Sequence, residues 1–185
     1  HVSSGGDVMN SRHIGPVDII EASENGLLIG LGLIDGRLMI LDEGLQILHE
    51  SLPADDDVET ISCIQFRTDE ILIVGRNSLG MTVDDRPENR LECWSHVNGM
   101  INTSEMPSKP TSFCATEDGV MVGCFNGELV YLTIGIEGHE IISQMDYKIS
   151  DITRWGNTFL VSYWFETSRI SSDGVILWQF ENHGI

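Results

Sequence analysis

A run of carboxylates is the first feature of this sequence that could bind a ligand. Asp55, Asp56 and Asp57 are consecutive, and Glu59 follows closely. Ca²⁺ prefers several oxygen ligands of this kind, but the run lacks the alternating spacing and the glycine of a calcium-binding loop. The run is typical of a solvated acidic turn, and a ligand-binding site is the alternative.

Three consecutive aromatic residues form a second candidate feature. Tyr163, Trp164 and Phe165 sit where an apolar run ends and a loop begins. Trp and Tyr dominate the residues that anchor protein partners, so the triplet is a candidate contact for a protein or peptide. The alternative is that these rings pack between neighbouring structural units.

The segment Arg76–Asn89 is longer than the matching segments elsewhere in the chain and is rich in charge. Lengthening a loop costs little closure entropy, so the segment fits either a binding loop or a tolerated insertion. Its charged residues Arg76, Asp84, Asp85 and Arg86 are candidate partner contacts.

The sequence contains no catalytic or metal-binding motif. Its six histidines are scattered, and no hydrolase elbow, phosphate-binding loop or H-E-x-x-H occurs. The Gly30-x-Gly32 pair has too little after it to bind a dinucleotide. We therefore predict that the protein is not an enzyme and requires neither a cofactor nor a metal.

The charge balance restricts the class of partner. Lys and Arg total 10 against 29 Asp and Glu, which gives a net charge of −19 over 185 residues. Such a field repels phosphate backbones and anionic membranes. We expect no nucleic-acid or membrane partner, and a protein or peptide partner that is preferably basic. The bland alternative is that the acids keep a β-rich surface soluble.

The four cysteines form no C-x-x-C motif, and no zinc-site spacing is present. Cys63, Cys114 and Cys124 lie inside apolar runs, where Cys behaves as a small hydrophobe. No apolar run is long enough to cross a bilayer, and the first residues do not resemble a signal peptide. We expect reduced thiols and a cytoplasmic protein, while a disulfide in a secreted protein is the alternative.

These features sit on a repeat with four parts. Each part has a strand-like run, a polar or glycine turn such as Asn25-Gly26, and a second, more apolar run. A third run follows, and a glycine opens a fourth run. These opening glycines are Gly44, Gly99, Gly138 and Gly174.

The repeat predicts an all-β fold, a β-propeller built of four-stranded antiparallel blades with four blades in this chain. Its second runs begin at intervals of 44, 49 and 39 residues, and a period near 40 to 45 is typical of propellers. A β-sandwich does not require one four-strand order to recur. The expected blades are residues 16–53, 54–107 (with a long loop at 76–89), 108–147 and 148–185, after an N-terminal tail or closing strand at 1–15.

The best internal match aligns Ser23–Gly30 with Thr116–Gly123, and a second glycine turn follows each segment. These segments resemble the repeats of quinoprotein-like (PQQ-like) propellers, and Asp173–Phe180 is similar to the end of such a repeat. The resemblance covers residues 16 to 180. WD40 repeats are the second resemblance, although the chain has no Trp-Asp pair.

These resemblances imply rings of roughly seven or eight blades. An open half-propeller exposes two apolar sheet faces. We therefore expect a second copy in a homodimer, or the remaining blades of a longer chain, to complete the ring. Closure by four blades alone is the alternative.

In a propeller, the loops from the second to the third strand and from one blade to the next share one face, and such loops carry binding residues. We expect a non-enzymatic scaffold that binds a protein or peptide through this face. The alternatives are a quinoprotein-type oxidoreductase or other small-ligand or metal-binding propeller, and a structural half of a larger assembly. The segments expected on this face include Arg76–Asn89, Phe125-Asn126, Asp146–Lys148 and Tyr163–Thr167.

Overall fold

The computed structural model describes residues 11–51, 59–78, 88–133 and 138–181. Within them, sixteen strands form four antiparallel sheets of four strands each, and the strands of each sheet follow one another in chain order. The described residues contain no helix. The predicted all-β fold of four-stranded blades is confirmed.

The strands of each blade have the following bounds. Blade 1 contains β1 (Val17–Ala22), β2 (Leu28–Leu33), β3 (Leu38–Asp42) and β4 (Ile47–Glu50). Blade 2 contains β5 (Glu59–Phe66), β6 (Ile71–Ser78), β7 (Asn89–Ser95) and β8 (Gly99–Glu105). Blade 3 contains β9 (Pro110–Ala115), β10 (Gly119–Cys124), β11 (Glu128–Thr133) and β12 (Glu140–Gln144). Blade 4 contains β13 (Ile149–Trp155), β14 (Thr158–Tyr163), β15 (Glu166–Ser171) and β16 (Ile176–Glu181).

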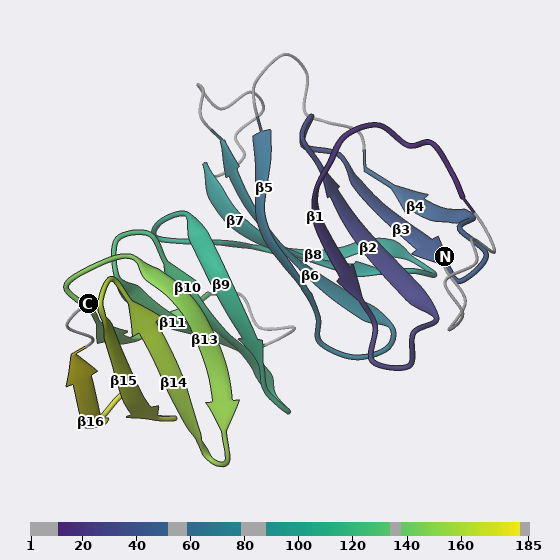
Figure 1. Cartoon of the computed structure of the whole chain (residues 1–185). Helices are drawn as coiled ribbons and strands as arrows, with labels where there is room; N and C mark the ends of the chain where they lie inside the picture. Colours follow the sequence, from purple (N-terminus) through teal and green to yellow (C-terminus); the bar gives the residue numbers. More distant parts are fainter. Residues whose placement is uncertain (1–10, 52–58, 79–87, 134–137, 182–185) are drawn as a thin grey trace.

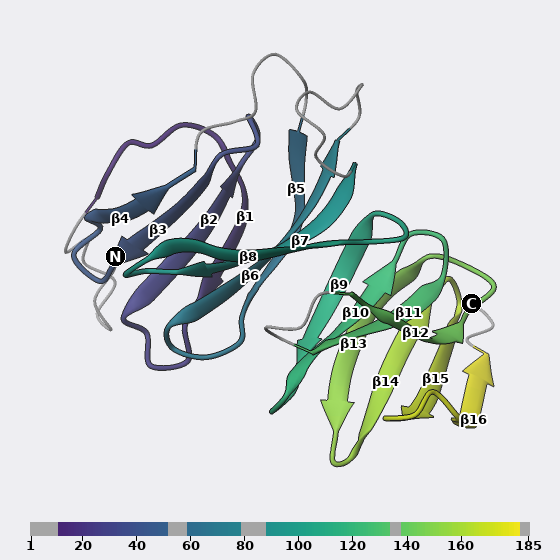
Figure 2. The same ribbon diagram turned by 180° about the vertical axis from the view of Figure 1, so that it is seen from behind.

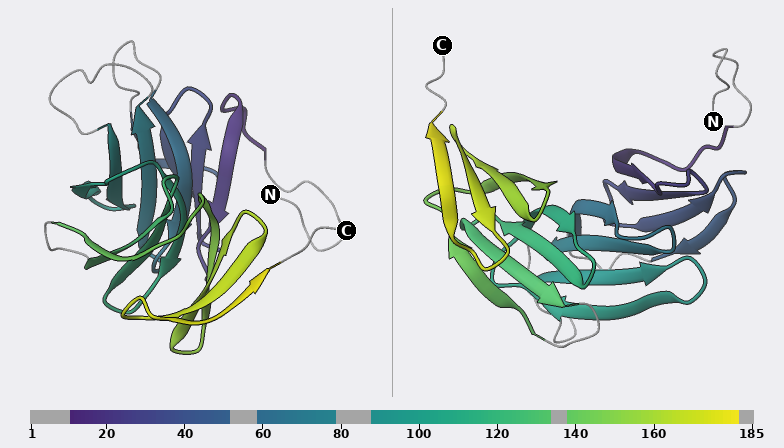
Figure 3. Two further views of the ribbon diagram at one scale, coloured as in Figure 1. Left: turned by 90° about the vertical axis from the view of Figure 1, so that its left-hand side faces the viewer. Right: turned by 90° about the horizontal axis from the view of Figure 1, so that it is seen from below.

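The blades follow one another in an open arc, with blade 1 at one end and blade 4 at the other (Figures 1 and 3). Adjacent blades contact one another mainly through their first strands β1, β5, β9 and β13. Seen from behind, the outer strands β8 and β12 lie in front of the inner strands of their sheets (Figure 2).

Alternation of side chains along each strand builds the cores between blades. In β14, Phe159, Val161 and Tyr163 point toward blade 3 and are buried, while Leu160 and Ser162 point the other way. Phe159, Val161 and Tyr163 join the core between blades 3 and 4. Two corresponding cores lie between blades 1 and 2 and between blades 2 and 3.

In blades 1 to 3, the next blade packs against a glycine on the second strand and a leucine opposite it on the third strand. We call these two places the receiving positions. These pairs are Gly32 with Leu38, Gly75 with Leu91, and Gly123 with Leu129. The glycine is needed because the next blade comes very close. A Cβ on Gly123 would lie 2.4 Å from Cγ2 of Ile149 in blade 4.

The two end faces of the arc differ in chemistry. On blade 1, the face that points away from blade 2 carries an apolar cluster that includes Leu31 and Met39, and Ile14 from the segment before β1 packs against it. On blade 4, Ser162 and Thr167 occupy the receiving positions, and their hydroxyl oxygens lie 3.3 Å apart. Trp155 and Trp178 lie on the same outward face of blade 4 as Ser162, where they meet edge-on and stay 51% and 38% exposed. The premise of two bare apolar end faces therefore fails for blade 1 and holds only in part for blade 4.

Candidate functional site: an exposed aromatic patch

Four exposed aromatic side chains lie on one face of blades 3 and 4, and we call them the aromatic patch. They are Phe125 in the β10–β11 turn, Tyr147 in the β12–β13 link, and Trp164 and Phe165 in the β14–β15 turn. Tyr147 stacks on Trp164 with ring centroids 5.7 Å apart, and Phe165 meets Trp164 edge-on at 5.1 Å. Ring contacts of this kind hold the patch together without burying it.

Lys148 connects Phe125 to the rest of this surface. Its Nζ lies 5.8 Å from the centroid of the Phe125 ring, within the range of a cation–π contact. Lys148 also directly follows Tyr147 in the β12–β13 link. The patch therefore extends across both blades and includes an exposed cation at its blade 3 side.

Trp164 adopts a backbone conformation that its residue type disfavours. Tyr163 pairs with Glu166, which leaves Trp164 and Phe165 as a two-residue hairpin turn. The φ of Trp164 is 48°, in the left-handed region where hairpins normally place Gly, Asn or Asp. This conformation costs a bulky residue about 1–2 kcal/mol, and yet the side chain is 70% exposed. The ring thus adds little core packing to offset that cost.

Acidic side chains border the patch. Asp146 directly precedes Tyr147, and Glu166 directly follows Phe165. Burial raises the pKa of the Tyr163 hydroxyl, and the charges of these two carboxylates raise it further, against a lowering effect of the hydrogen bond with Ser168. A partner that contacts the patch therefore meets negative charge at its edge.

The structure corrects the expectation for two of the predicted contact residues. Trp164 and Phe165 are exposed, as a partner contact requires, but Tyr163 is only 3% exposed and its hydroxyl pairs with Ser168 Oγ at 2.8 Å. Arg76 was expected in a loop, but β6 continues through it to Ser78 and it is only 2% exposed. Asp55, Asp56, Asp57, Asp84, Asp85 and Arg86 lie outside the described residues.

Three members of this surface were not singled out from the sequence. Phe125, Tyr147 and Lys148 lie in segments expected on the binding face, but nothing in their local sequence shows that they share one surface with Trp164. The sequence did offer one signal for this surface. Three loops expected on the same face each contain an aromatic residue, and these are Phe125, Tyr147 and Trp164. The alternation of β14 also carried a signal, because it places Tyr163 on the buried face with Phe159 and Val161.

Arg76 belongs to a buried charge network formed by Glu59, Arg76, Arg90 and Glu92. Arg76 Nε donates to Glu92 at 2.7 Å, and Arg90 Nε donates to the other oxygen of Glu92 at 2.9 Å. Glu59 pairs with both arginines. The network is neutral overall, with two cations and two anions, as buried charges require.

The charge network also joins blade 2 to blade 1. Arg76 Nη1 donates to the backbone oxygen of Gly36 at 2.7 Å, and Nη2 donates to Ser51 Oγ at 3.0 Å. Burial alone would raise the pKa of Glu92, but Arg76 first, and then Arg90 and the indole of Trp94, more than compensate and lower it. We conclude that these residues hold the fold together and are not accessible to a partner.

The described residues include no group of three or more His, Cys, Asp or Glu placed to hold a metal ion. The four cysteines are free thiols, and burial raises the pKa of Cys63 and of Cys124 to about 12. These thiols therefore stay protonated and unreactive at neutral pH. In the described part of the chain, no helix is long and apolar enough to span a membrane.

Neither a protein-family model nor a curated protein matches this sequence. Among solved structures, the β-propeller domain of Myceliophteria thermophila Cps50 (Swd1) is similar over 95% of this chain, with a TM-score of 0.73 and 11% identity. The computationally designed Ika8 protein is similar over 91% of the chain, with a TM-score of 0.65 and 15% identity. The designed Ika4 protein is similar over 92%, with a TM-score of 0.61 and 14% identity.

At such low identity these likenesses establish the fold alone, which is that of a β-propeller. The similarity to quinoprotein-like repeats stays a prediction. The chain spans 58% of the Cps50 domain and 51% of Ika8, about half of each, but 93% of Ika4.

Proposed function

We propose that this protein is a non-enzymatic interaction scaffold that binds a protein segment or peptide, preferably basic, through the aromatic patch. The observation that carries the proposal is the exposed position of Trp164 in a conformation unfavourable for tryptophan. Clusters of Trp, Tyr and Phe that remain exposed are typical of protein-binding hot spots.

The charge of the protein supports a basic partner. The net charge of −19 favours the encounter with cationic peptides, and Asp146 and Glu166 place carboxylates directly beside Tyr147 and Phe165 in the chain. Arginine and lysine side chains can also lie over Trp and Tyr rings. A basic segment with apolar or aromatic residues between the charges fits both features.

A defined peptide library tests the proposal directly. Random twelve-residue peptides displayed on phage would be selected on the wild-type protein, and each enriched peptide would then be synthesised and titrated. We expect enrichment of basic peptides whose affinity drops by at least tenfold in Trp164→Ala, as for a hot-spot residue. Trp178→Ala is the matched control, since Trp178 is also exposed but lies on β16, outside the patch.

Two results would overturn the proposal. One is the absence of any enriched peptide sequence. The other is equal affinity of the enriched peptides for wild type and Trp164→Ala, which would place binding elsewhere on the molecule. Circular dichroism of both variants confirms that the comparison is between folded proteins.

A further inference from the structure

We propose that a pocket between blades 3 and 4 binds a free α-amino acid with an apolar side chain. The pocket has a volume of about 380 Å³ and opens between the β9–β10 turn, the β13–β14 turn and the β15–β16 turn. These turns lie at the opposite strand ends from those that carry the aromatic patch. The inference therefore does not depend on the proposed function.

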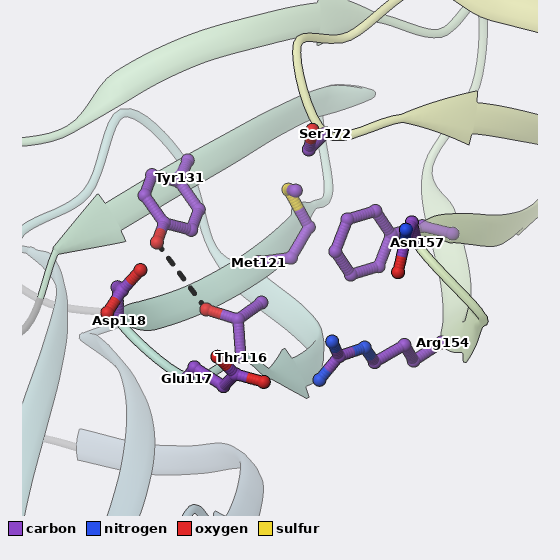
Figure 4. A pocket seen from close by; sticks show the side chains of 9 residues that line it. Thr116, Glu117, Asp118, Met121, Tyr131, Arg154, Asn157 and Ser172 are labelled. Carbon is purple, nitrogen blue, oxygen red and sulfur yellow. Dashed lines mark hydrogen bonds between the residues drawn. The ribbon is translucent and has the colours of Figure 1, made fainter.

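The floor of the pocket is apolar. Met121 on β10 and Phe159 on β14 are buried beneath it, and Tyr131 on β11 forms one wall (Figure 4). The Tyr131 hydroxyl lies 3.4 Å from Thr116 Oγ1, which fixes the ring against the β9–β10 turn. A floor of this kind with a few polar groups at its rim is typical of small-molecule sites, and the volume lies within their range.

The rim carries opposite charges on its two sides. Glu117 and Asp118 lie on the blade 3 side, in the β9–β10 turn, and Arg154 lies on the blade 4 side near the end of β13 (Figure 4). Met121 of blade 3 and Phe159 of blade 4 are the buried floor residues that both sides border. The rim is therefore anionic on one side of an apolar floor and cationic on the other.

These rim charges are free to bind a ligand. Arg154 uses Nε to donate to the Gly156 backbone oxygen at 3.2 Å, and no other described residue accepts from its guanidinium. Glu117 accepts a hydrogen bond from Arg67 through its backbone oxygen only. Within the described ranges, neither the Glu117 nor the Asp118 carboxylate has a hydrogen-bond or ion-pair partner.

An apolar α-amino acid satisfies all of these groups at once. Its ammonium group would donate to Asp118 and Glu117, and its carboxylate would accept from Arg154 and from the amide of Asn157, which also lines the pocket. Its side chain would cover Met121 and Phe159. An amine without a carboxylate leaves the Arg154 guanidinium unpaired, and an acid without an amine meets two carboxylates.

Titration of the ¹⁵N-labelled chain with L-phenylalanine, followed by amide chemical shifts, tests the proposal. For a small ligand in an open pocket we expect a dissociation constant on the order of 1 mM. The shifts should concentrate at Asp118, Met121 and Phe159. Three analogues each lack one part of the ligand: 2-phenylethylamine lacks the carboxylate, 3-phenylpropionate lacks the ammonium group, and glycine lacks the side chain. Each should bind at least about tenfold more weakly than L-phenylalanine.

Single charge changes assign the contacts. Arg154→Gln should weaken L-phenylalanine binding about tenfold and leave 2-phenylethylamine binding unchanged. Asp118→Asn should weaken L-phenylalanine binding but not that of 3-phenylpropionate. Glu24→Gln, an exposed acid in the β1–β2 turn of blade 1, is the matched control and should change neither.

The shift map of the wild-type chain keeps the test valid if a variant fails to fold. Shifts that concentrate outside blades 3 and 4, or no shifts at about ten times the expected dissociation constant, would overturn the proposal. Equal binding of 2-phenylethylamine and L-phenylalanine would overturn it in favour of a simple cation site. Equal binding by Arg154→Gln and wild type would overturn the assigned carboxylate contact and with it the proposed ligand class.

Discussion

At the scale of single residues, the conformation and exposure of Trp164 differ from those of a residue that stabilises the fold. Its left-handed backbone costs stability, and its ring contacts with Tyr147 and Phe165 do no more than offset that cost. A residue maintained for packing would be buried, as Tyr163 is beside it. The exposed ring is best explained by a contact that the isolated chain does not make.

We expect Trp164→Gly to leave the free energy of unfolding within about 1 kcal/mol of wild type. Glycine removes about 1–2 kcal/mol of backbone cost, and the lost ring contacts are worth about as much. Urea denaturation measures the difference, with Trp178→Gly as a control for loss of an exposed tryptophan from a regular strand. A loss well above 2 kcal/mol would show instead that Trp164 is part of the structural core.

The charge network makes stability depend on pH through Glu92. The pKa of Glu92 is lower in the folded chain than in the unfolded chain, so the native state binds fewer protons. Its contribution is complete above the unfolded pKa of about 4.3 and is lost as the pH falls through the folded pKa. Glu92→Gln removes the contribution and leaves two buried arginines with Glu59 alone.

We therefore expect Glu92→Gln to lower the free energy of unfolding at pH 7 by about 3–5 kcal/mol. The difference from wild type should shrink as the pH falls below about 4. Urea denaturation at a series of pH values measures both. A difference that stays constant over that range would contradict the role given to the ionised carboxylate.

Whether a residue is exposed or buried could be predicted from the sequence where the local pattern determines it. It could not be predicted where partners distant in the sequence determine it. Trp164 and Phe165 follow from a run of aromatic residues at a strand end, which is visible locally. The buried position of Arg76 could not be predicted in this way. Its guanidinium is buried because it donates to Glu59, to Glu92 and to the blade 1 residues Gly36 and Ser51. None of these partners is near Arg76 in the sequence.

At the scale of strands, the contact between blades depends on the glycine of each second strand. Gly123 shows this most clearly, since a methyl group there would lie 2.4 Å from Ile149 and 2.7 Å from Ser112 Oγ. Ser162 occupies the same position in blade 4, where no further blade of the described chain packs. In blade 3 this position must therefore be glycine because blade 4 packs closely on it, whereas in blade 4 a larger residue is tolerated.

We expect Gly123→Ala to lower the free energy of unfolding by roughly 1–3 kcal/mol, the usual cost of overpacking. Ser162→Ala is the matched control and should change it by less than about 0.5 kcal/mol, as for a surface site. Denaturant melts of the two variants measure these values. Similar losses at both positions would mean that the closeness of blades 3 and 4 is not what selects glycine.

The strand order was predictable because each strand is delimited by its own turn residues. Gly99, Gly138 and Gly174 have positive φ and stand at or just before the fourth strands, as expected. The chemistry of the end faces was not predictable in the same way. It depends on which neighbour each alternate residue faces, and that follows only from the arrangement of blades.

At the scale of the whole molecule, the end faces bear on how the arc meets other chains. The expectation of a completing half rested on two apolar ends. Blade 1 has an apolar end face, but Ile14 packs on it, and blade 4 presents Ser162 and Thr167 where the other blades have glycine and leucine. These two polar residues are typical of the outer face of a capping repeat, although Trp155 and Trp178 leave apolar surface elsewhere on that face.

We therefore expect this chain to be monomeric in solution, with the mass of a single 20.5 kDa chain. The double variant Ser162→Gly/Thr167→Leu restores the receiving pair of blades 1–3 and should raise self-association or the binding of a hydrophobic dye, because it exposes apolar surface that a blade can cover. Sedimentation velocity across a concentration series measures both. A wild-type dimer that a bulky Ser162→Trp change disrupts would instead show that blade 4 receives a second copy, and the ring would then be completed by association despite its polar end.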